Sequence, residues 1–138
     1  MISYIDSSVL LRVVLGEPKR LKEWENIKHG VSSALIEVEC LRTLDRLRVS
    51  GKLTSKQLVS YRETMFEMFD ALEIVEISRP VLSRASSPFP TALGTLDAIH
   101  LSTALAYSDI RGQKLVFATH DMELASGAKS VGMEVLGC

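Results

Sequence analysis

Short apolar runs alternate with longer amphipathic segments along the chain. Each run is rich in branched or aromatic residues and is bounded by polar or turn residues, as is typical of a strand. Because the runs are continuous rather than strictly alternating, they favour strands buried on both faces of a sheet. The predicted strands cover Ile2–Ile5, Val31–Ser33, Glu73–Ile77, Leu115–Ala118 and Met133–Leu136.

The segments between these runs have the spacing and end signals of helices. Predicted helices cover Ser7–Leu15, Pro18–Lys28, a long stretch from about Ser33 to Val49, Thr54–Ala71, a short turn from Pro80, Leu96–Tyr107 and Met122–Val131. Alternation of strands and helices predicts an α/β fold with a central parallel sheet between helical layers.

Composition narrows the class of protein. The 138 residues are 46% hydrophobic and 24% charged, which predicts one domain over 1–138 with a substantial core. The net charge of -1 gives no overall positive field, so any contact with nucleic acid needs a local patch. Cys40 and Cys138 indicate neither a zinc site nor a disulfide framework. No signal peptide or membrane span is found, and we expect a cytoplasmic protein.

Four acidic positions stand out against this predicted fold. Asp6 and Asp121 each follow an apolar strand, at the carboxyl edge where open parallel sheets bind ligands. Asp97 begins a predicted helix. A fourth acid lies in SSALIEVECLRTL, where Glu37 and Glu39 flank the apolar stripe of a helix on opposite sides. Helical periodicity does not choose between these two glutamates.

Each acid also has a purely structural explanation, which is favoured for any one of them taken alone. Asp6 and Asp121 both precede helices and are suitable N-caps. Asp97 in a first helical turn complements the helix dipole. Glu39 has Arg42 or Thr43 as a partner one turn further on. Only the set as a whole, with two acids at the ligand-binding edge, indicates a site.

Several carboxylates in one pocket require a cation or protons. Two unit charges about 4 Å apart repel by about 4 kcal/mol at an effective dielectric of about 20. Oxygen ligands suit Mg²⁺ or Mn²⁺ better than zinc or copper. Phosphodiester hydrolysis is the chemistry that such a site performs best, with one or two ions.

Four blocks of the sequence, in order, resemble the PIN-domain ribonucleases, and most closely the VapC-type toxins of type II toxin–antitoxin pairs. The blocks are YIDSSVLLRVVLGE, SALIEVECLR, LDAIHLSTAL and FATHDMELASGAKSVGMEVL. The likeness runs from Ile2 to Leu136. It implies a PIN-like three-layer α/β/α sandwich with a central parallel sheet.

Carried over residue by residue, the resemblance implies an acidic catalytic and metal-binding site. Its four acids fall on Asp6, Glu39, Asp97 and Asp121, so that the block around Glu39 selects it over Glu37. The family's T-x-D element falls on Thr119, whose hydroxyl would support an acid or a bound water, and Ser7 matches a small polar residue after the first acid.

The resemblance also implies an activity and partners. The activity is Mg²⁺- or Mn²⁺-dependent cleavage of single-stranded RNA, and the partner is a small antitoxin protein that fills the toxin groove. Family members usually form homodimers. Gly94 departs from the family, where many relatives carry a basic residue before T-L-D-A; this departure affects a phosphate or dimer contact rather than the acidic site.

Other polar residues have weaker claims to function. Arg12, Arg42 and Arg46 are candidates for RNA backbone contacts, although a solvated helix face is the favoured explanation of the basic stretch from 42 to 56. His100, one turn after Asp97, could approach the site or a phosphate, but a helix-packing residue is the favoured explanation, and His120 is expected to point away from the acids.

Two other classes of function compete with a nuclease. The first is a catalytically inert module that keeps the PIN fold for binding, which the presence of all four acids disfavours. The second is a phosphatase-like hydrolase with Asp6 as nucleophile. That chemistry usually requires a second Asp two residues later, where this chain has Ser8.

Overall fold

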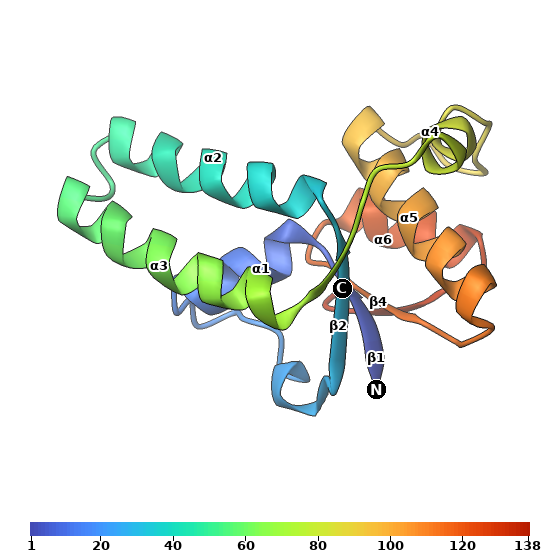
Figure 1. Ribbon diagram of the computed structural model, residues 1–138, viewed down its shortest axis with the longest axis horizontal. Coiled ribbons are helices and arrows are strands. Elements are labelled where there is room, and N and C mark those ends of the chain that lie inside the picture. The colour runs from blue at the N-terminus through green and yellow to red at the C-terminus, as the bar shows by residue number, and fades with distance from the viewer.

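Five parallel strands form the centre of the molecule, with the first strand in the middle (Figure 1). The computed structural model describes residues 1–138. The strand order is β3-β2-β1-β4-β5. The strands are β1 (Ile2–Ile5), β2 (His29–Ser33), β3 (Glu73–Val75), β4 (Val116–Ala118) and β5 (Glu134–Leu136). Since β1 pairs directly with β4, the strands that precede Asp6 and Asp121 are neighbours.

Six α-helices cover the two faces of the sheet (Figure 1). On one side lie α1 (Ser7–Val14), α2 (Leu35–Val49) and α3 (Ser55–Ala71). On the other side lie α4 (Arg79–Ala85), α5 (Thr95–Arg111) and α6 (Met122–Ser130). The predicted three-layer α/β/α architecture is confirmed. No helix combines the length and the apolar character needed to cross a bilayer.

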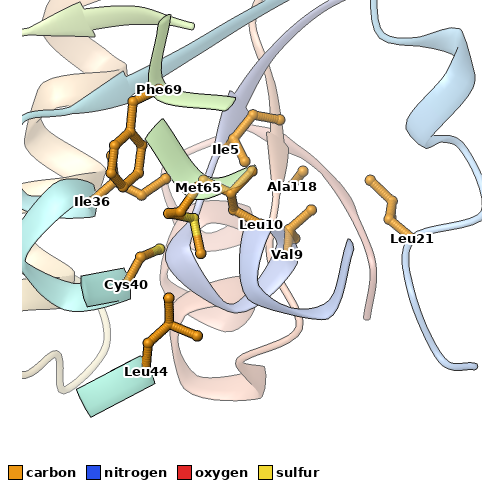
Figure 2. Close-up of a cluster of buried hydrophobic side chains, with 10 residues drawn as sticks. All are labelled: Ile5, Val9, Leu10, Leu21, Ile36, Cys40, Leu44, Met65, Phe69 and Ala118. Atoms are coloured by element: carbon orange, nitrogen blue, oxygen red, sulfur yellow. The ribbon is translucent and has the colours of Figure 1, made fainter. Parts of the chain in front are cut away.

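Two hydrophobic clusters, one on each face of the sheet, hold the layers together. Successive residues of a strand point to opposite faces, so Ile5 packs into the cluster under α1–α3 and Tyr4 into the cluster under α5 and α6. In the first cluster, Figure 2 shows Met65 and Cys40 converging from α3 and α2 on the residues of β1 and α1. Cys40 is a buried core residue, as the sequence indicated.

The predicted helix over Pro18–Lys28 is wrong. Only a short 3₁₀ turn, Trp24–Asn26, forms there. Leu21, Trp24 and Ile27 are spaced three residues apart rather than 3.6, and all three pack against the cluster under α1–α3. This spacing suits a tight, irregular path along the core, and the tertiary contacts override the helix propensity of the lysines and glutamates around them.

Other boundaries differ by a few residues. Helix α5 continues four residues beyond the predicted end at Tyr107, to Arg111, where Gly112 adopts a left-handed φ of 61°. The last turn of the helix carries Ile110, which is 83% exposed. This apolar residue does not belong to the stripe that faces the core, so the apolar periodicity does not indicate the last turn. Helix α3 begins at the predicted cap, Thr54, which forms a complete capping box with Gln57.

Candidate active site

Asp6 lies at the carboxyl end of β1, next to the end of β4. Its backbone N–H donates to the carbonyl of Ala118 at 3.0 Å, which continues the β1–β4 pairing. Its carboxylate is 5% exposed and accepts hydrogen bonds from the hydroxyls of Thr119, at 2.9 Å, and Ser8, at 2.7 Å. Asp6 occupies the N-cap position of α1, but its side chain accepts no backbone N–H of the first turn, so the side-chain capping explanation is wrong for it.

Thr119 and Ser8 link this carboxylate to the strand–helix turn that carries Asp121. The hydroxyl of Thr119 also accepts the backbone N–H of Asp121, and that of Ser8 accepts the backbone N–H of His120, both at 3.0 Å. Ser8 therefore contacts the first acid, whereas Ser7, the residue matched by the family resemblance, lines the cavity beside Glu39. The imidazole of His120 points to the carbonyl of Gly137, away from the acids as expected.

Glu39 reaches the site from α2 and meets a histidine. Its Oε1 lies 2.5 Å from Nε2 of His100, and Nδ1 of His100 lies 2.6 Å from the Tyr4 hydroxyl. The surface-pair explanation of Glu39 is wrong for its side chain, since Arg42 pairs with Asp45 instead. His100 is completely buried, but it contacts the acidic site as well as packing within the fold.

Asp97 lies in the first turn of α5, as predicted. Burial raises the pKa of its carboxyl to about 6, and the negative charges of Asp121, Asp6 and Glu39 contribute to the rise. Burial also lowers the pKa of His100, but the hydrogen bond and charge of Glu39, with Asp6 and Asp97, outweigh it and leave that pKa raised. The acids from β1, α2, α5 and the β4–α6 turn therefore converge.

Asp121 has a structural role as well as its place among the acids. Its Oδ1 accepts the backbone N–H groups of Glu123 and Leu124, at 2.9 and 3.1 Å, and so caps α6. The capping explanation is thus correct for this residue. Its charge nevertheless acts on Asp97, and only one of its two carboxylate oxygens is used in capping the helix.

The donor atoms of the cluster fit a hard divalent cation. Ligand atoms of Asp6, Glu39 and His100 all lie within 4.8 Å of one another, and Asp97 is electrostatically coupled to the same group. Carboxylate oxygens predominate, which suits Mg²⁺ or Mn²⁺. Asp6 is buried and Glu39 and Asp97 are half-buried, whereas Asp121 is exposed. A cation also provides the positive charge that this set of acids needs.

The candidate RNA-contacting arginines lie on two sides of the acids. A cavity of about 340 Å³ is lined by Glu39, Arg42, Arg46 and Ser7, among other residues. Arg42 is paired with Asp45, whereas Arg46 donates only to the Thr43 hydroxyl. Arg12 lines a separate cavity of about 510 Å³ with three further cations, Lys19, Arg20 and Lys22.

Sequence reasoning missed two residues that contact the acids or their partners, Ser8 and Tyr4, and favoured helix packing over approach to the site for His100. The sequence indicates Ser8 only as a position that lacks a second Asp. Tyr4 is a hydroxyl-bearing aromatic residue in the first strand, two positions before Asp6, and this position is an available signal. His100 lies one helical turn from Asp97, and this i, i+3 spacing places both on the same face of α5.

Comparison with known proteins agrees with the geometry. The sequence model of the PIN domain family matches residues 3–129. The chain belongs to the PIN domain family. This PIN domain is 30% identical over 136 residues to Ribonuclease VapC47 of Mycobacterium tuberculosis (strain CDC 1551 / Oshkosh), covering 94% of this chain and 91% of that protein.

A second relative and a solved structure extend the comparison. Ribonuclease VapC46 of Mycobacterium tuberculosis (strain ATCC 25618 / H37Rv) is 29% identical over 136 residues, 96% of this PIN domain and 95% of the relative. The fold is similar to that in the crystal structure of VapBC2 from Rickettsia felis bound to a DNA fragment from their promoter, with a TM-score of 0.70, 13% identity and 99% of each chain covered.

Proposed function

We propose that this PIN domain is a metal-dependent endoribonuclease that cleaves single-stranded regions of RNA, and that it is the toxin of a type II toxin–antitoxin pair. The observation that carries the proposal is the approach of ligand atoms of Asp6 and Glu39, from distant segments, to within 4.8 Å, together with the action of their charges and that of Asp121 on Asp97. The names of its relatives, both VapC ribonucleases, support the same reaction.

The four acids are the proposed ligands of one or two Mg²⁺ or Mn²⁺ ions, directly or through water. Such ions, when bound, lower the pKa of a water molecule and offset charge on the phosphate. Thr119 and Ser8 hold the Asp6 carboxylate through Oδ2, which leaves its Oδ1 for a ligand. The capping bonds of Asp121 similarly fix the direction of its side chain.

The RNA backbone is proposed to pass the acids along α2. Arg46 is the strongest candidate there, because it shares a cavity with Glu39 and has no acidic partner. Arg42 lines the same cavity but is held by Asp45. Arg12 is the candidate on the other side, beside the lysines of the loop after α1. Contacts of this kind bind phosphate by charge and carry no sequence information.

The remaining parts of the proposal concern assembly. We propose a small antitoxin protein as the partner that blocks the site, which the VapBC fold relative supports, and the cytoplasm as the place of action. The homodimer stays a prediction from the family resemblance.

The test of the nuclease uses the purified chain, a fluorescent single-stranded RNA and added Mn²⁺ or Mg²⁺. We expect cleavage that stops in EDTA and that Asp6→Asn reduces by about a hundredfold or more, because metal ligation supplies several kcal/mol to the transition state. Asp109→Asn is the matched control, since Asp109 is exposed and pairs with Arg84 away from the acids. Wild-type cleavage in EDTA would refute the metal proposal.

The test of the toxin role is made in cells. Expression of the chain alone should arrest growth, and co-expression of the protein encoded immediately upstream should relieve the arrest. Asp6→Asn should abolish the arrest without loss of folded protein. A folded wild-type chain that binds RNA or an antitoxin but cleaves nothing would favour the inert binding module instead.

A further inference from the structure

Tyr4 and His100 form a buried chain of hydrogen bonds that ends on Glu39. Tyr4 comes from β1 and His100 from α5, and neither side chain is exposed. The Tyr4 hydroxyl lies 2.6 Å from Nδ1 of His100, and Nε2 of His100 lies 2.5 Å from Oε1 of Glu39. The ring of Tyr4 also stacks on Phe117 of β4, so the chain is anchored in the sheet.

The positions of the protons follow from the partner at the far end. The backbone N–H of Ser33 donates to the Tyr4 oxygen at 3.1 Å, and burial raises the pKa of the phenol well above its ordinary range, so it keeps its proton. In the neutral ring Nδ1 accepts the Tyr4 proton, and in the protonated ring, which the raised pKa of His100 favours, Nδ1–H donates to the Tyr4 oxygen. In both forms a ring hydrogen is on Nε2, where it is donated to Glu39.

We propose that His100 is a positioning residue, held by Tyr4, which fixes the Glu39 carboxylate through Nε2–H and is not itself a metal ligand. The inference rests on the proposed metal site and deepens it. Distance alone also allows His100 as a ligand, since Nε2 lies within 4.8 Å of the Asp6 and Glu39 oxygens. A nitrogen that carries a donated proton has no lone pair for a cation, whereas a hydrogen-bonded carboxylate keeps its second oxygen free.

The first measurement needs neither metal nor RNA. Nitrogen-15 NMR of the metal-free protein, labelled at histidine, should show a proton on Nε2 of His100 that exchanges slowly with solvent. Glu39→Gln should shift that Nε2–H resonance, and Tyr4→Phe should shift the Nδ1 resonance. An Nε2 that carries no proton, or an Nε2–H resonance that does not shift in Glu39→Gln, would overturn the assignment. This result stands whether or not the chain cleaves RNA.

The second measurement uses Mn²⁺ binding followed by electron paramagnetic resonance. His100→Gln keeps an N–H donor near the position of Nε2, whereas His100→Asn keeps a group near Nδ1 only. We expect His100→Asn to weaken Mn²⁺ binding by about 10–100-fold, the usual effect of removing a partner of a metal ligand, and His100→Gln to restore most of the affinity. Unchanged affinity in His100→Asn would refute a positioning role.

The spectrum of bound Mn²⁺ separates positioning from ligation. We expect no directly coordinated nitrogen in the wild-type protein, and a coupling typical of bound imidazole would make His100 a ligand and overturn the proposal. Circular dichroism checks that each variant is folded. If His100→Asn does not fold, the comparison of wild-type, His100→Gln and Tyr4→Phe proteins still tests the positioning role of His100. Tyr4→Phe keeps the aromatic ring of residue 4 and removes only the hydroxyl that orients the imidazole.

Discussion

Thr119 donates its hydroxyl to the carboxylate of Asp6 at 2.9 Å, across 113 positions of the chain. The same hydroxyl accepts the backbone N–H of Asp121, so one buried side chain sets the distance between two of the proposed ligands. Both roles depend on the adjacent positions of β1 and β4.

Thr119→Val should show what the hydroxyl contributes to stability and cleavage, because valine has nearly the same shape and lacks the hydroxyl. The substitution leaves the half-buried N–H of Asp121 without its partner and removes one of the two hydroxyls that bind Oδ2 of Asp6, so we expect a loss of about 1–3 kcal/mol in the free energy of unfolding and a reduced cleavage rate. Thr119→Ser keeps the hydroxyl and should restore most of both. Denaturant unfolding and the RNA assay measure the two effects. Equal rates for the valine and wild-type proteins would show that the hydroxyl does not support the site.

Asp121 allows its two roles to be measured separately. Asp121→Asn keeps an oxygen that caps α6 but removes the charge, so cleavage should fall while stability changes little. Asp121→Ala also removes the cap, which should cost about 1 kcal/mol further in stability. Thermal unfolding of both variants, beside the RNA assay, checks this. A stable but fully active Asp121→Asn protein would remove Asp121 from the catalytic set.

The raised pKa of Asp97 predicts a dependence of stability on pH. Because its pKa is about 6 in the folded protein and about 3.9 in an unfolded chain, the folded state holds the proton more tightly. The resulting stabilisation is full below the unfolded value and is lost as the pH rises through about 6. In chelator, Asp97→Asn should therefore gain stability relative to wild type across this window.

Mn²⁺ should reverse that order above pH 6, because the ion stabilises the wild-type carboxylates. Its affinity for the wild-type protein should fall as the pH drops through about 6, since binding must displace the Asp97 proton. Thermal unfolding at several pH values, with and without Mn²⁺, tests both statements. Parallel curves for wild type and Asp97→Asn would contradict them, and Asp109→Asn is the control for a change of charge on α5.

Gly137 holds the end of β5 against the site. Its φ is +98°, and a Cβ there would overlap the backbone carbonyl of Thr119. Gly132 also has a positive φ, +85°, but open space around it. Gly132→Ala should cost only the backbone strain, about 1–2 kcal/mol, whereas Gly137→Ala should cost more and slow RNA cleavage. Equal losses of stability in the two variants would show that the turn relaxes freely.

Arg46 should contribute to RNA affinity through charge. Arg46→Gln should weaken binding of single-stranded RNA by a catalytically impaired Asp6→Asn protein and reduce the salt dependence by about 0.7 in log–log slope, the value for one phosphate contact. Arg48→Gln is the matched control, because Arg48 is paired with Asp45 and does not line the cavity beside Glu39. Titrations at several salt concentrations measure the slope, and identical slopes for both variants would exclude the contact.

Local signals predicted the features that depend on sequence neighbours. The apolar runs gave the parallel sheet, and the positions of Asp6 and Asp121 after two strands placed them at one edge. Which strands are neighbours is a tertiary property, so periodicity left open whether the two acids meet. Glu39 was separated from Glu37 only by the family resemblance, because both flank the same helical stripe.

The errors have the same origin. The segment from Pro18 to Lys28 has helix-forming residues, but its path is set by where Leu21 and Trp24 reach the core. His100 was expected to be a packing residue because its partners, Tyr4 and Glu39, lie 96 and 61 positions away. Contacts between residues so far apart along the chain produce no periodic pattern of apolar and polar positions in the sequence.

The central place of β1 in the sheet has a consequence for synthesis of the protein. Asp6 is synthesised more than one hundred residues before the strand that must lie beside it, Val116–Ala118, and before the threonine that must hold it, Thr119. A polypeptide that is still being synthesised, or that ends early, therefore lacks an assembled active site. For an enzyme whose proposed target is RNA, the order of synthesis therefore delays assembly of the acids until most of the chain has been made.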